Sequence, residues 1–306
     1  MSEIGRPVRV VSISFGVGKT LEEVAVVVDQ EGALGVDLIA LPETWLGQGE
    51  GTEEPIDGPM ITTMSELAQK HSAYIVCPID RIDDGRRLNS AVLLDRNGDV
   101  SAIYDKLYPY WGEFGLVPMI DVGQNPVVAE TDFGRVGFAI CFDVNFPDMW
   151  QTMADQGAEL VVWPSAYSAG RALQAHAIMH HYFIVTATQS GDCQIFDITG
   201  ERILDERSEG ITVSRAVLDF DRGIYHHNFN LDKRDLLLQE HGYQVAQEEF
   251  FHREHWFVLK ATAPGASARD LARQYGLEEL REYKARSQRQ MDVFRSDQVL
   301  VTTVTQ

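Results

Sequence analysis

A glutamate, a lysine and a cysteine each stand at the end of an apolar, strand-like run of this 306-residue chain. Glu43 lies in the segment LPETW, Lys106 in YDKLY and Cys141 in GFAICFD. In open α/β sheets, the carboxyl ends of strands are where loops meet a rigid scaffold and where ligands bind. We therefore expect the three side chains to converge on one site.

A carboxylate, an ammonium group and a thiol in one site can carry out acyl transfer. A cysteine attacks a carbonyl carbon as the thiolate, and a free thiol with a pKa of about 8.5 needs a base or a positive neighbour at neutral pH. Glu43 can serve as that base and Lys106 can supply the charge. The Lys106 ammonium and the backbone N–H of Phe142 are candidate donors to the oxyanion. Glu43 would then protonate the leaving amine and activate the hydrolytic water.

The segments around these residues resemble those of a known family. The resemblance is carried by five motifs: the PE of LPET, the DK of YDKLY, GRVG before the cysteine, CFDVNFP around it and WPSA after it. From about Val8 to about Asp219 the chain resembles the nitrilase superfamily of carbon–nitrogen hydrolases. The resemblance implies a Glu-Lys-Cys triad that cleaves non-peptide amides, ureas or nitriles through a thioester.

The resemblance also implies a second glutamate shortly after the lysine, which orients the lysine and the substrate. Glu113 in YWGEFG stands at this position. Aromatic residues in loops after the strand ends are expected to line the pocket, with packing under a loop as the alternative; they are Trp45, Tyr110, Trp111, Trp163 and Tyr167. Trp163 stands where the family usually has a small polar residue before Pro-Ser, and this bulky, apolar side chain leaves the substrate open.

The motif CFDxxFP looks more like aliphatic amidases or N-carbamoyl hydrolases than like true nitrilases. No Arg or Lys stands between Cys141 and Ser168, although Arg171 follows shortly. This favours a neutral amide over a carbamoyl compound that carries a carboxylate. Nitrile hydrolysis by the same triad and a non-catalytic, ligand-binding protein are the alternatives.

The histidines could suggest a metal site. His176, His180 and His181 share a segment, and His226, His227, His252 and His255 follow. A zinc site needs three or four ligands, and neither an HExxH motif nor a CxxC pair occurs. We expect no metal and no cofactor. Cys77 and Cys193 lie in strand-like runs and are interpreted as buried thiols.

The net charge of the chain disfavours two classes of binding partner. The formal net charge of −20 opposes binding to nucleic acid phosphates or to an anionic membrane surface. No apolar run approaches the roughly 18 residues of a membrane span, and the N-terminus lacks a signal-peptide core. We expect a cytoplasmic enzyme that acts on a small molecule.

The elements that must position the three residues can be predicted from periodicity. Strands are expected at Val8–Phe15, Val36–Leu41 and Tyr74–Pro78, and a hairpin turns at Arg96-Asn97-Gly98. A capping box at Thr20 opens one helix to about Ala33, and a second helix spans about Pro59–His71.

The second half repeats this plan. Strands are expected at Arg135–Cys141, Leu160–Trp163, Phe183–Thr188 and Ile211–Asp219, with helices at Pro147–Gln156 and Gly170–His181 and hairpins at Val127–Cys141 and Gln194–Asp205. Two such β-α-β-α-β halves predict a four-layer α-β-β-α sandwich with two mixed sheets. The resemblance implies the same fold.

The last part of the chain is less regular. We expect residues 1–222 to form the hydrolase core and residues 223–306 to form a C-terminal extension of the same domain. Ser267–Phe294 predicts a helix interrupted near Gly276. In the family such tails reach across subunit interfaces, so we expect a homodimer or a higher homo-oligomer; packing on the same subunit is the alternative.

Overall fold

The computed structural model describes residues 3–304, with side chains described for residues 3–296. By its internal contacts the chain divides into two compact units. The large unit is Val8–Leu218, and the small unit combines Met1–Pro7 with Asp219–Gln306. All three residues that the sequence singles out for chemistry lie in the large unit.

Two six-stranded sheets form the large unit, in the orders β12-β1-β2-β3-β4-β5 and β11-β10-β9-β8-β7-β6. The strands of the first sheet are β1 (Pro7–Ser14), β2 (Leu38–Ala40), β3 (Tyr74–Asp83), β4 (Arg86–Leu94), β5 (Val100–Asp105) and β12 (Thr212–Asp219). Those of the second are β6 (Val128–Glu130), β7 (Arg135–Phe138), β8 (Leu160–Ser165), β9 (Phe183–Thr188), β10 (Asp192–Phe196) and β11 (Arg202–Arg207).

Both sheets are mixed and follow the same plan. In the first, β1, β2 and β3 are parallel and β4 and β5 continue antiparallel. In the second, β7, β8 and β9 are parallel and β10 and β11 continue antiparallel. Two antiparallel steps restore direction, so β5 runs the same way as β2.

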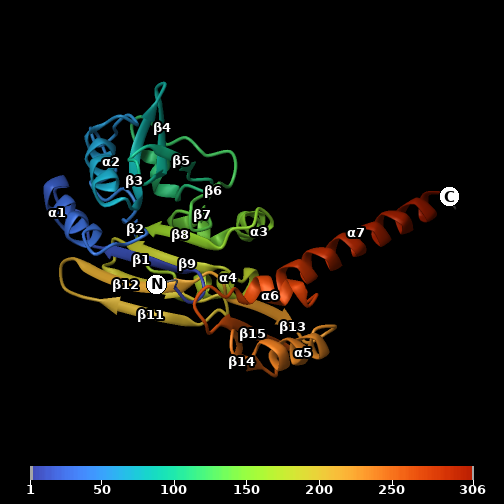
Figure 1. Cartoon of the computed structure of the whole chain (residues 1–306). Helices are drawn as coiled ribbons and strands as arrows, with labels where there is room; N and C mark the ends of the chain where they lie inside the picture. The colour runs from blue at the N-terminus through green and yellow to red at the C-terminus, as the bar shows by residue number, and fades with distance from the viewer. Residues whose placement is uncertain (1–2, 305–306) are drawn as a thin grey trace. The chain divides into compact units, whose positions relative to one another are not determined.

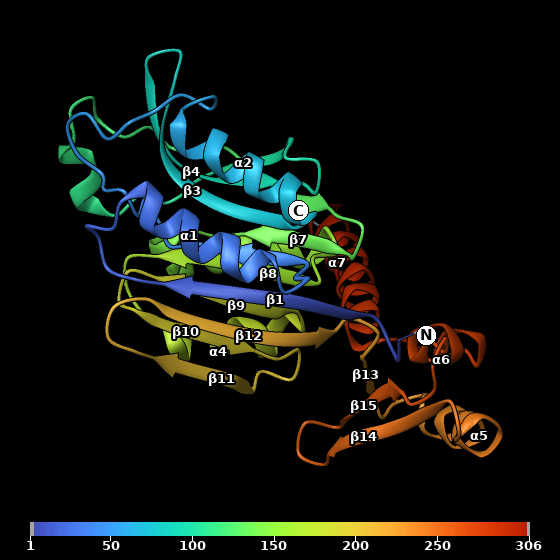
Figure 2. The same ribbon diagram turned by 60° about the vertical axis from the view of Figure 1, so that its left-hand side comes forward.

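Helices cover the outer faces of the sheets (Figures 1 and 2). Helices α1 (Leu21–Gly32) and α2 (Pro59–His71) pack together on the first sheet, and α3 (Pro147–Asp155) and α4 (Gly170–His180) lie on the second. The inner faces of the two sheets contact each other directly. On β1, Ser12 Oγ donates to the Thr186 carbonyl oxygen, and Ser14 Oγ donates to the Asp192 carbonyl oxygen at 2.9 Å. The four-layer α-β-β-α sandwich expected from the sequence is confirmed.

The local signals explain several element ends. Thr20 caps α1: its hydroxyl accepts from Glu23 N at 3.2 Å, while the Glu23 carboxylate accepts from Thr20 N at 2.9 Å. Gly98 (φ +82°) closes the β4–β5 hairpin, in a conformation that favours glycine. Strand β7 ends at Phe138, three residues before the predicted end.

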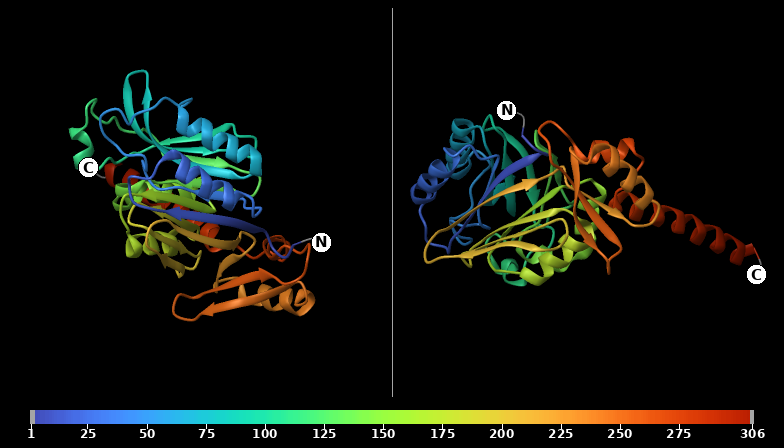
Figure 3. Two further views of the ribbon diagram at one scale, coloured as in Figure 1. Left: turned by 90° about the vertical axis from the view of Figure 1, so that its left-hand side faces the viewer. Right: turned by 60° about the horizontal axis from the view of Figure 1, so that its bottom comes forward.

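The small unit contains an antiparallel sheet in the order β13-β15-β14, formed by β13 (Gly223–His226), β14 (Val245–Phe251) and β15 (Trp256–Ala261). Helices α5 (Leu231–His241) and α6 (Ala268–Gln274) lie beside these strands (Figure 3). Leu237, Val245, Phe257 and Ala272 belong to its own apolar core. This sheet was not foreseen from the sequence.

The break near Gly276 in the C-terminal helix is present. Helix α6 ends at Gln274, Gly276 has φ +72°, and α7 spans Leu280–Val304. In the part of the chain that the structure describes, we find no helix long and apolar enough to cross a membrane.

Candidate active site

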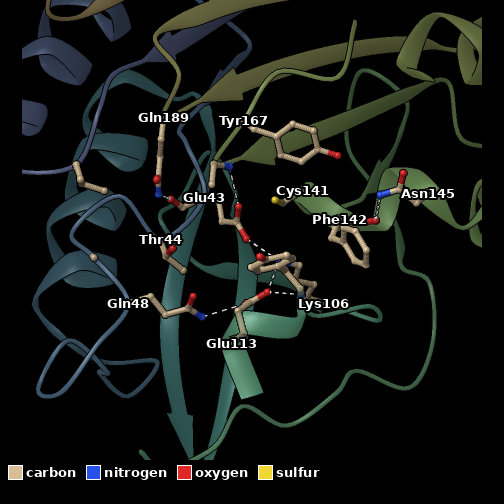
Figure 4. A pocket seen from close by; sticks show the side chains of 14 residues that line it. Glu43, Thr44, Gln48, Lys106, Glu113, Cys141, Phe142, Asn145, Tyr167 and Gln189 are labelled. Atoms are coloured by element: carbon tan, nitrogen blue, oxygen red, sulfur yellow. Dashed lines mark hydrogen bonds and ion pairs between the residues drawn. The ribbon is translucent and has the colours of Figure 1, made fainter. Parts of the chain in front are cut away.

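A cavity of about 630 Å³ opens in the large unit where several strands end (Figure 4). Glu43 follows β2, Lys106 follows β5, Tyr167 follows β8 and Gln189 follows β9. Its lining consists of Val17, Glu43, Thr44, Gly47, Gln48, Lys106, Tyr110, Glu113, Cys141, Phe142, Asn145, Ala166, Tyr167 and Gln189. The volume lies within the roughly 300–1,000 Å³ range of small-molecule sites.

The Lys106 ammonium lies between two carboxylates. Its Nζ donates to Glu43 Oε1 at 2.8 Å and to Glu113 Oε2 at 2.7 Å, and the lysine side chain is 1% exposed. Burial by itself lowers the pKa of Lys106, but the charges of Glu43 and Glu113 outweigh it and the net pKa is raised. Lys106 is therefore a cation at neutral pH and cannot serve as a base.

The Glu43 carboxylate is held from both sides. Oε1 accepts from Lys106 and from Asn89 Nδ2 at 2.8 Å, and Oε2 accepts from Ala166 N at 2.7 Å. Gln189 Nε2 fixes its backbone by donating to the Glu43 carbonyl oxygen at 2.5 Å. The carboxylate thus has a defined orientation, as a base that transfers protons must have.

Glu113 lies on a short 3₁₀ helix, η1 (Trp111–Gly115), and its carboxylate points back into the cavity (Figure 4). Its Oε2 accepts from Tyr110 N at 2.6 Å and its Oε1 from Asn89 Nδ2 at 2.9 Å and Gln48 Nε2 at 3.2 Å. Although burial raises the pKa of Glu113, Lys106, Asn89 and the Tyr110 N–H lower it overall. Glu113 is therefore ionised and serves as a fixed anion beside the lysine.

Asn89, on β4, was missed in the sequence analysis. Its amide group bridges Glu43 and Glu113, so it sets the spacing of the two carboxylates. The available signal was a run of polar residues, Arg87, Asn89 and Ser90, at the start of a strand that continues as an apolar run, because polar groups are buried at a cost unless they are paired.

Cys141 opens a second 3₁₀ helix, η2 (Cys141–Asn145), immediately after β7 and two linking residues. Its φ is +50°, and Thr44, next to Glu43, has φ +32°. Non-glycine residues rarely adopt positive φ, at a cost of about 1–3 kcal/mol each. The turn at Cys141 aims its sulfur into the cavity, toward Glu43 and Lys106 (Figure 4).

Burial raises the pKa of the Cys141 thiol to about 12, with a further contribution from the Glu43 charge and an opposing one from Lys106. The thiol is therefore protonated at neutral pH. A neutral thiol beside a carboxylate needs that carboxylate to take its proton as it attacks.

Asp143 was also overlooked as a positioning residue. Its Oδ2 accepts from Tyr104 OH at 2.6 Å and Ile140 N at 2.8 Å, and its Oδ1 accepts from Tyr108 N at 2.9 Å. Burial raises its pKa to about 7 despite these donors. Asp143 thus ties the turn at Cys141 to the segment that carries Lys106.

Among the described residues, no group of three or more His, Cys, Asp or Glu side chains is arranged to hold a metal ion. His176 packs on Trp150 and hydrogen-bonds the Val144 carbonyl oxygen at 2.9 Å. His226 and His255 stack at 6.4 Å in the small unit.

Comparison with known proteins identifies the family. The sequence model of the carbon-nitrogen hydrolase family matches residues 10–222, more than half of the chain. The chain belongs to this family. The resemblance to the nitrilase superfamily is thereby confirmed.

Two curated relatives of this carbon-nitrogen hydrolase are amidases. A deaminated glutathione amidase of Yersinia enterocolitica is 28% identical over 181 residues, which are 51% of this chain and 63% of the relative. The chain thus spans less than two thirds of that relative's length. A 2-oxoglutaramate amidase of Paenarthrobacter nicotinovorans is 27% identical over 248 residues, covering 70% of this chain and 83% of the relative.

A solved structure shares the fold. It is a variant of the amidase from Nesterenkonia sp. AN1 with the acetamide moiety of fluoroacetamide added covalently at the active site cysteine. It matches with a TM-score of 0.62 at 20% identity, over 71% of this chain and 92% of that one.

The residues that the sequence analysis proposed for the site are not all brought together. Glu43, Lys106, Glu113 and Cys141 line one cavity, as do Phe142 and Tyr167. Tyr110 also lines it, but the three tryptophans expected there, Trp45, Trp111 and Trp163, lie outside the lining.

Trp163 is fully buried beside Cys141 rather than in the cavity. Its Nε1 donates to the Cys141 carbonyl oxygen at 3.1 Å, and its ring meets that of Tyr167 edge-on at 5.7 Å. It lies on β8, whose side chains are all buried, so the bulky ring supports the strained turn.

Trp111 faces solvent and is 82% exposed. Its ring contacts Phe114 at 6.1 Å, within the same turn as Glu113. The backbone of η1 directs Glu113 inward and Trp111 outward. Trp45, another expected aromatic, is buried against Phe15 in the core.

Proposed function

We propose that the protein hydrolyses a small non-peptide amide to a carboxylic acid and ammonia through a thioester on Cys141. The observation that carries this proposal is the clamp of Lys106 between Glu43 and Glu113 in the cavity that Cys141 also lines. The amidase relatives and the cysteine adduct in the Nesterenkonia amidase structure support it.

In the first half-reaction, the Cys141 sulfur attacks the amide carbon while Glu43 takes the thiol proton. The carbonyl oxygen becomes an oxyanion, which the Lys106 ammonium and the Phe142 N–H stabilise. Glu43 then gives the proton to the amide nitrogen as the C–N bond breaks, so ammonia leaves and the acyl group stays on sulfur. Each proton moves through a carboxylate that Asn89 and Ala166 hold in place.

In the second half-reaction, Glu43 removes a proton from water, which attacks the thioester carbon. The C–S bond breaks, the carboxylic acid leaves and the thiol regains the proton from Glu43. Glu113 remains charged throughout and holds Lys106 by its 2.7 Å bond. One carboxylate therefore serves both half-reactions, and the enzyme returns to its starting state.

The test is ammonia release from a panel of aliphatic amides, 2-oxoglutaramate, N-carbamoyl amino acids, ureas and nitriles. We expect amides to be the best substrates, and mass spectrometry of the enzyme with a poor amide to show an acyl adduct on Cys141. Cys141→Ala removes the nucleophile and little volume, so it should abolish turnover without unfolding the protein. Hydrolysis by Cys141→Ala would contradict the covalent mechanism.

The expected homo-oligomer can be checked with the same preparation. Met291, Val293 and Phe294 on α7 are exposed, which is consistent with a covered surface in an assembly. Sedimentation equilibrium showing a single 34.3 kDa species would contradict self-association.

A further inference from the structure

The cavity offers little to a negatively charged substrate. Among its described lining residues, Lys106 is the one basic side chain, and it already donates to two carboxylates. Two acidic side chains and one basic side chain leave the lining with a formal charge of −1. A carboxylate on the acyl chain, away from the reacting carbonyl group and Lys106, would find no cation of its own.

The amide side chains of the lining each donate a hydrogen bond to the protein. Gln48 Nε2 donates to Glu113, and Gln189 Nε2 to the Glu43 carbonyl oxygen. Asn145 Nδ2 donates to the Phe142 carbonyl oxygen at 3.1 Å. These amides hold the site together, and none of them is paired with a guanidinium or ammonium that could neutralise a carboxylate.

The remaining surface suits an uncharged chain. Tyr110, Phe142 and Tyr167 present aromatic rings, and Val17 and Ala166 present aliphatic groups. The cavity of about 630 Å³ also exceeds the space that an acyl group of two carbons would fill. The acyl group can therefore be extended, but the surface around it provides no counter-ion.

From this arrangement we infer that the site selects an extended, uncharged amide and rejects an amide whose acyl chain carries a carboxylate. The inference rests on the proposed function and adds the class of substrate to it. The physical reason is that a carboxylate buried without a cation loses its hydration and gains no compensating pair. The site would therefore distinguish the two kinds of amide by binding the charged one poorly, and not by binding the uncharged one with extra affinity.

The decisive pair of substrates is glutaramide and glutaramate, which have the same length and differ in one terminal amide or carboxylate. We expect kcat/KM to be about 100-fold higher for glutaramide than for glutaramate, because an unpaired buried charge costs more free energy than a neutral group. This ratio is taken after division by two, since glutaramide has two reactive amides. The measurement is repeated at about 1 M salt, where the Debye length falls to roughly 3 Å. A preference that persists there arises in the cavity and not from the protein's net charge of −20.

A substitution at Val17 can supply the cation that the cavity lacks. It lies on the cavity lining and is 63% exposed, so an arginine there can keep its stem on the surface and place its charge at the opening. Val17→Arg should raise the glutaramate-to-glutaramide ratio of kcat/KM up to about fivefold relative to the uncharged Val17→Gln, since exposed charge pairs contribute up to about 1 kcal/mol. An unchanged ratio would overturn the inference.

Binding to Cys141→Ala separates this inference from the proposed function. Isothermal titration with each compound needs no chemistry, and glutaramide should bind more tightly than glutaramate. Equal or tighter binding of glutaramate, or binding of neither compound, overturns charge selection. Absence of turnover and of any Cys141 adduct in the unmodified enzyme overturns the proposed function, while the titration still decides on the substrate class.

Discussion

Two clusters of charge are buried in the first sheet of the large unit, and they differ in what their partners leave open. One is Lys106 between Glu43 and Glu113, and the other is the pair formed by Arg87 on β4 and Asp80 on β3. Both basic side chains are 1% exposed or less. Burial and pairing are thus common to the two clusters.

The Arg87 guanidinium is enclosed by its partners. It donates to both oxygens of Asp80, to the Gly49 carbonyl oxygen at 2.6 Å and to the Val117 carbonyl oxygen at 3.3 Å. Neither Arg87 nor Asp80 lines the cavity. This cluster holds the loop that follows Gln48 and the segment that follows η1, which carries Glu113, so its role is to support the site.

The Lys106 cluster instead borders the cavity and faces the thiol of Cys141. The comparison teaches that a buried charge becomes a candidate for chemistry when part of its surroundings is empty space next to a nucleophile. Where protein donors and acceptors surround the buried charges completely, as they do around Arg87 and Asp80, the ion pair stabilises the fold. The following substitutions test this distinction.

The largest effect is expected for Glu43→Gln. An amide cannot take the thiol proton or activate water, so kcat/KM should fall by about 10⁴, the upper end for general acid–base catalysis. Steady-state kinetics on the best amide of the panel measure this loss. Glu66→Gln, an exposed glutamate on α2, is the matched control and should leave the rate unchanged. If Glu43→Gln were milder than Glu113→Gln, the role of base would move to Glu113.

Arg87→Met should show the opposite pattern, with a loss of stability that exceeds any direct effect on chemistry. The substitution leaves Asp80 buried without its cation, which costs about 3–5 kcal/mol. Urea unfolding measures the loss. The double variant Arg87→Met, Asp80→Leu removes both charges and should recover most of the stability; failure to recover would mean that the loop contacts of Arg87, and not the unpaired Asp80, dominate.

Glu113→Gln should have an intermediate effect. Glutamine keeps the size and an acceptor oxygen but loses the charge that holds Lys106, and loss of one positioning contact costs roughly 10² in rate. Comparison of kcat/KM with that of Glu43→Gln, with acylation of Cys141 followed in parallel, checks this order. A rate equal to that of the unmodified enzyme would show that the clamp around Lys106 is structural, like the Arg87 cluster.

The smallest effect is expected for Trp111→Ala. The ring is largely exposed and lies outside the cavity lining, so kcat/KM should change by less than about threefold, in keeping with the small effects of surface substitutions. Tyr167→Ala, which removes a ring from the lining, is the comparison and should raise KM more. A large rise in KM for Trp111→Ala would restore the sequence-based expectation that this tryptophan binds substrate.

Local sequence patterns determined the family and most of the large unit. Alternating and continuous apolar runs predict strands because neighbouring strands and helices cover both of their faces. The capping box at Thr20 and the turn at Gly98 mark element ends through local hydrogen bonding and positive φ. The motifs around Glu43, Lys106 and Cys141 indicated a carbon-nitrogen hydrolase, and the family match confirms it.

Only the tertiary structure decided which of the neighbouring residues face the cavity. Asn89 reaches both glutamates because β4 lies between β3 and β5 in a particular register, and no local pattern encodes that register. Trp163 and Trp111 follow the same kind of loop signal, yet one is buried beside Cys141 and the other faces solvent. The direction of a side chain at a strand end depends on the turn that follows, which long-range packing selects.

The small unit shows the same limit for whole elements. Strand β14 carries Gln247, Glu248 and Glu249, and the alternation that predicts strands is weak there. It forms because β15 pairs with it and because Phe257 and Leu259 provide a core. Strands gain their hydrogen bonds from other segments of the chain, which lie nearby in sequence for β14 and β15 but about 30 residues away for β13 and β15, whereas a helix such as α1 satisfies its own. For this protein, the chain's local chemistry therefore determined the helices, most strands and the reactive residue types, and the pairing of distant segments decided the geometry of the site.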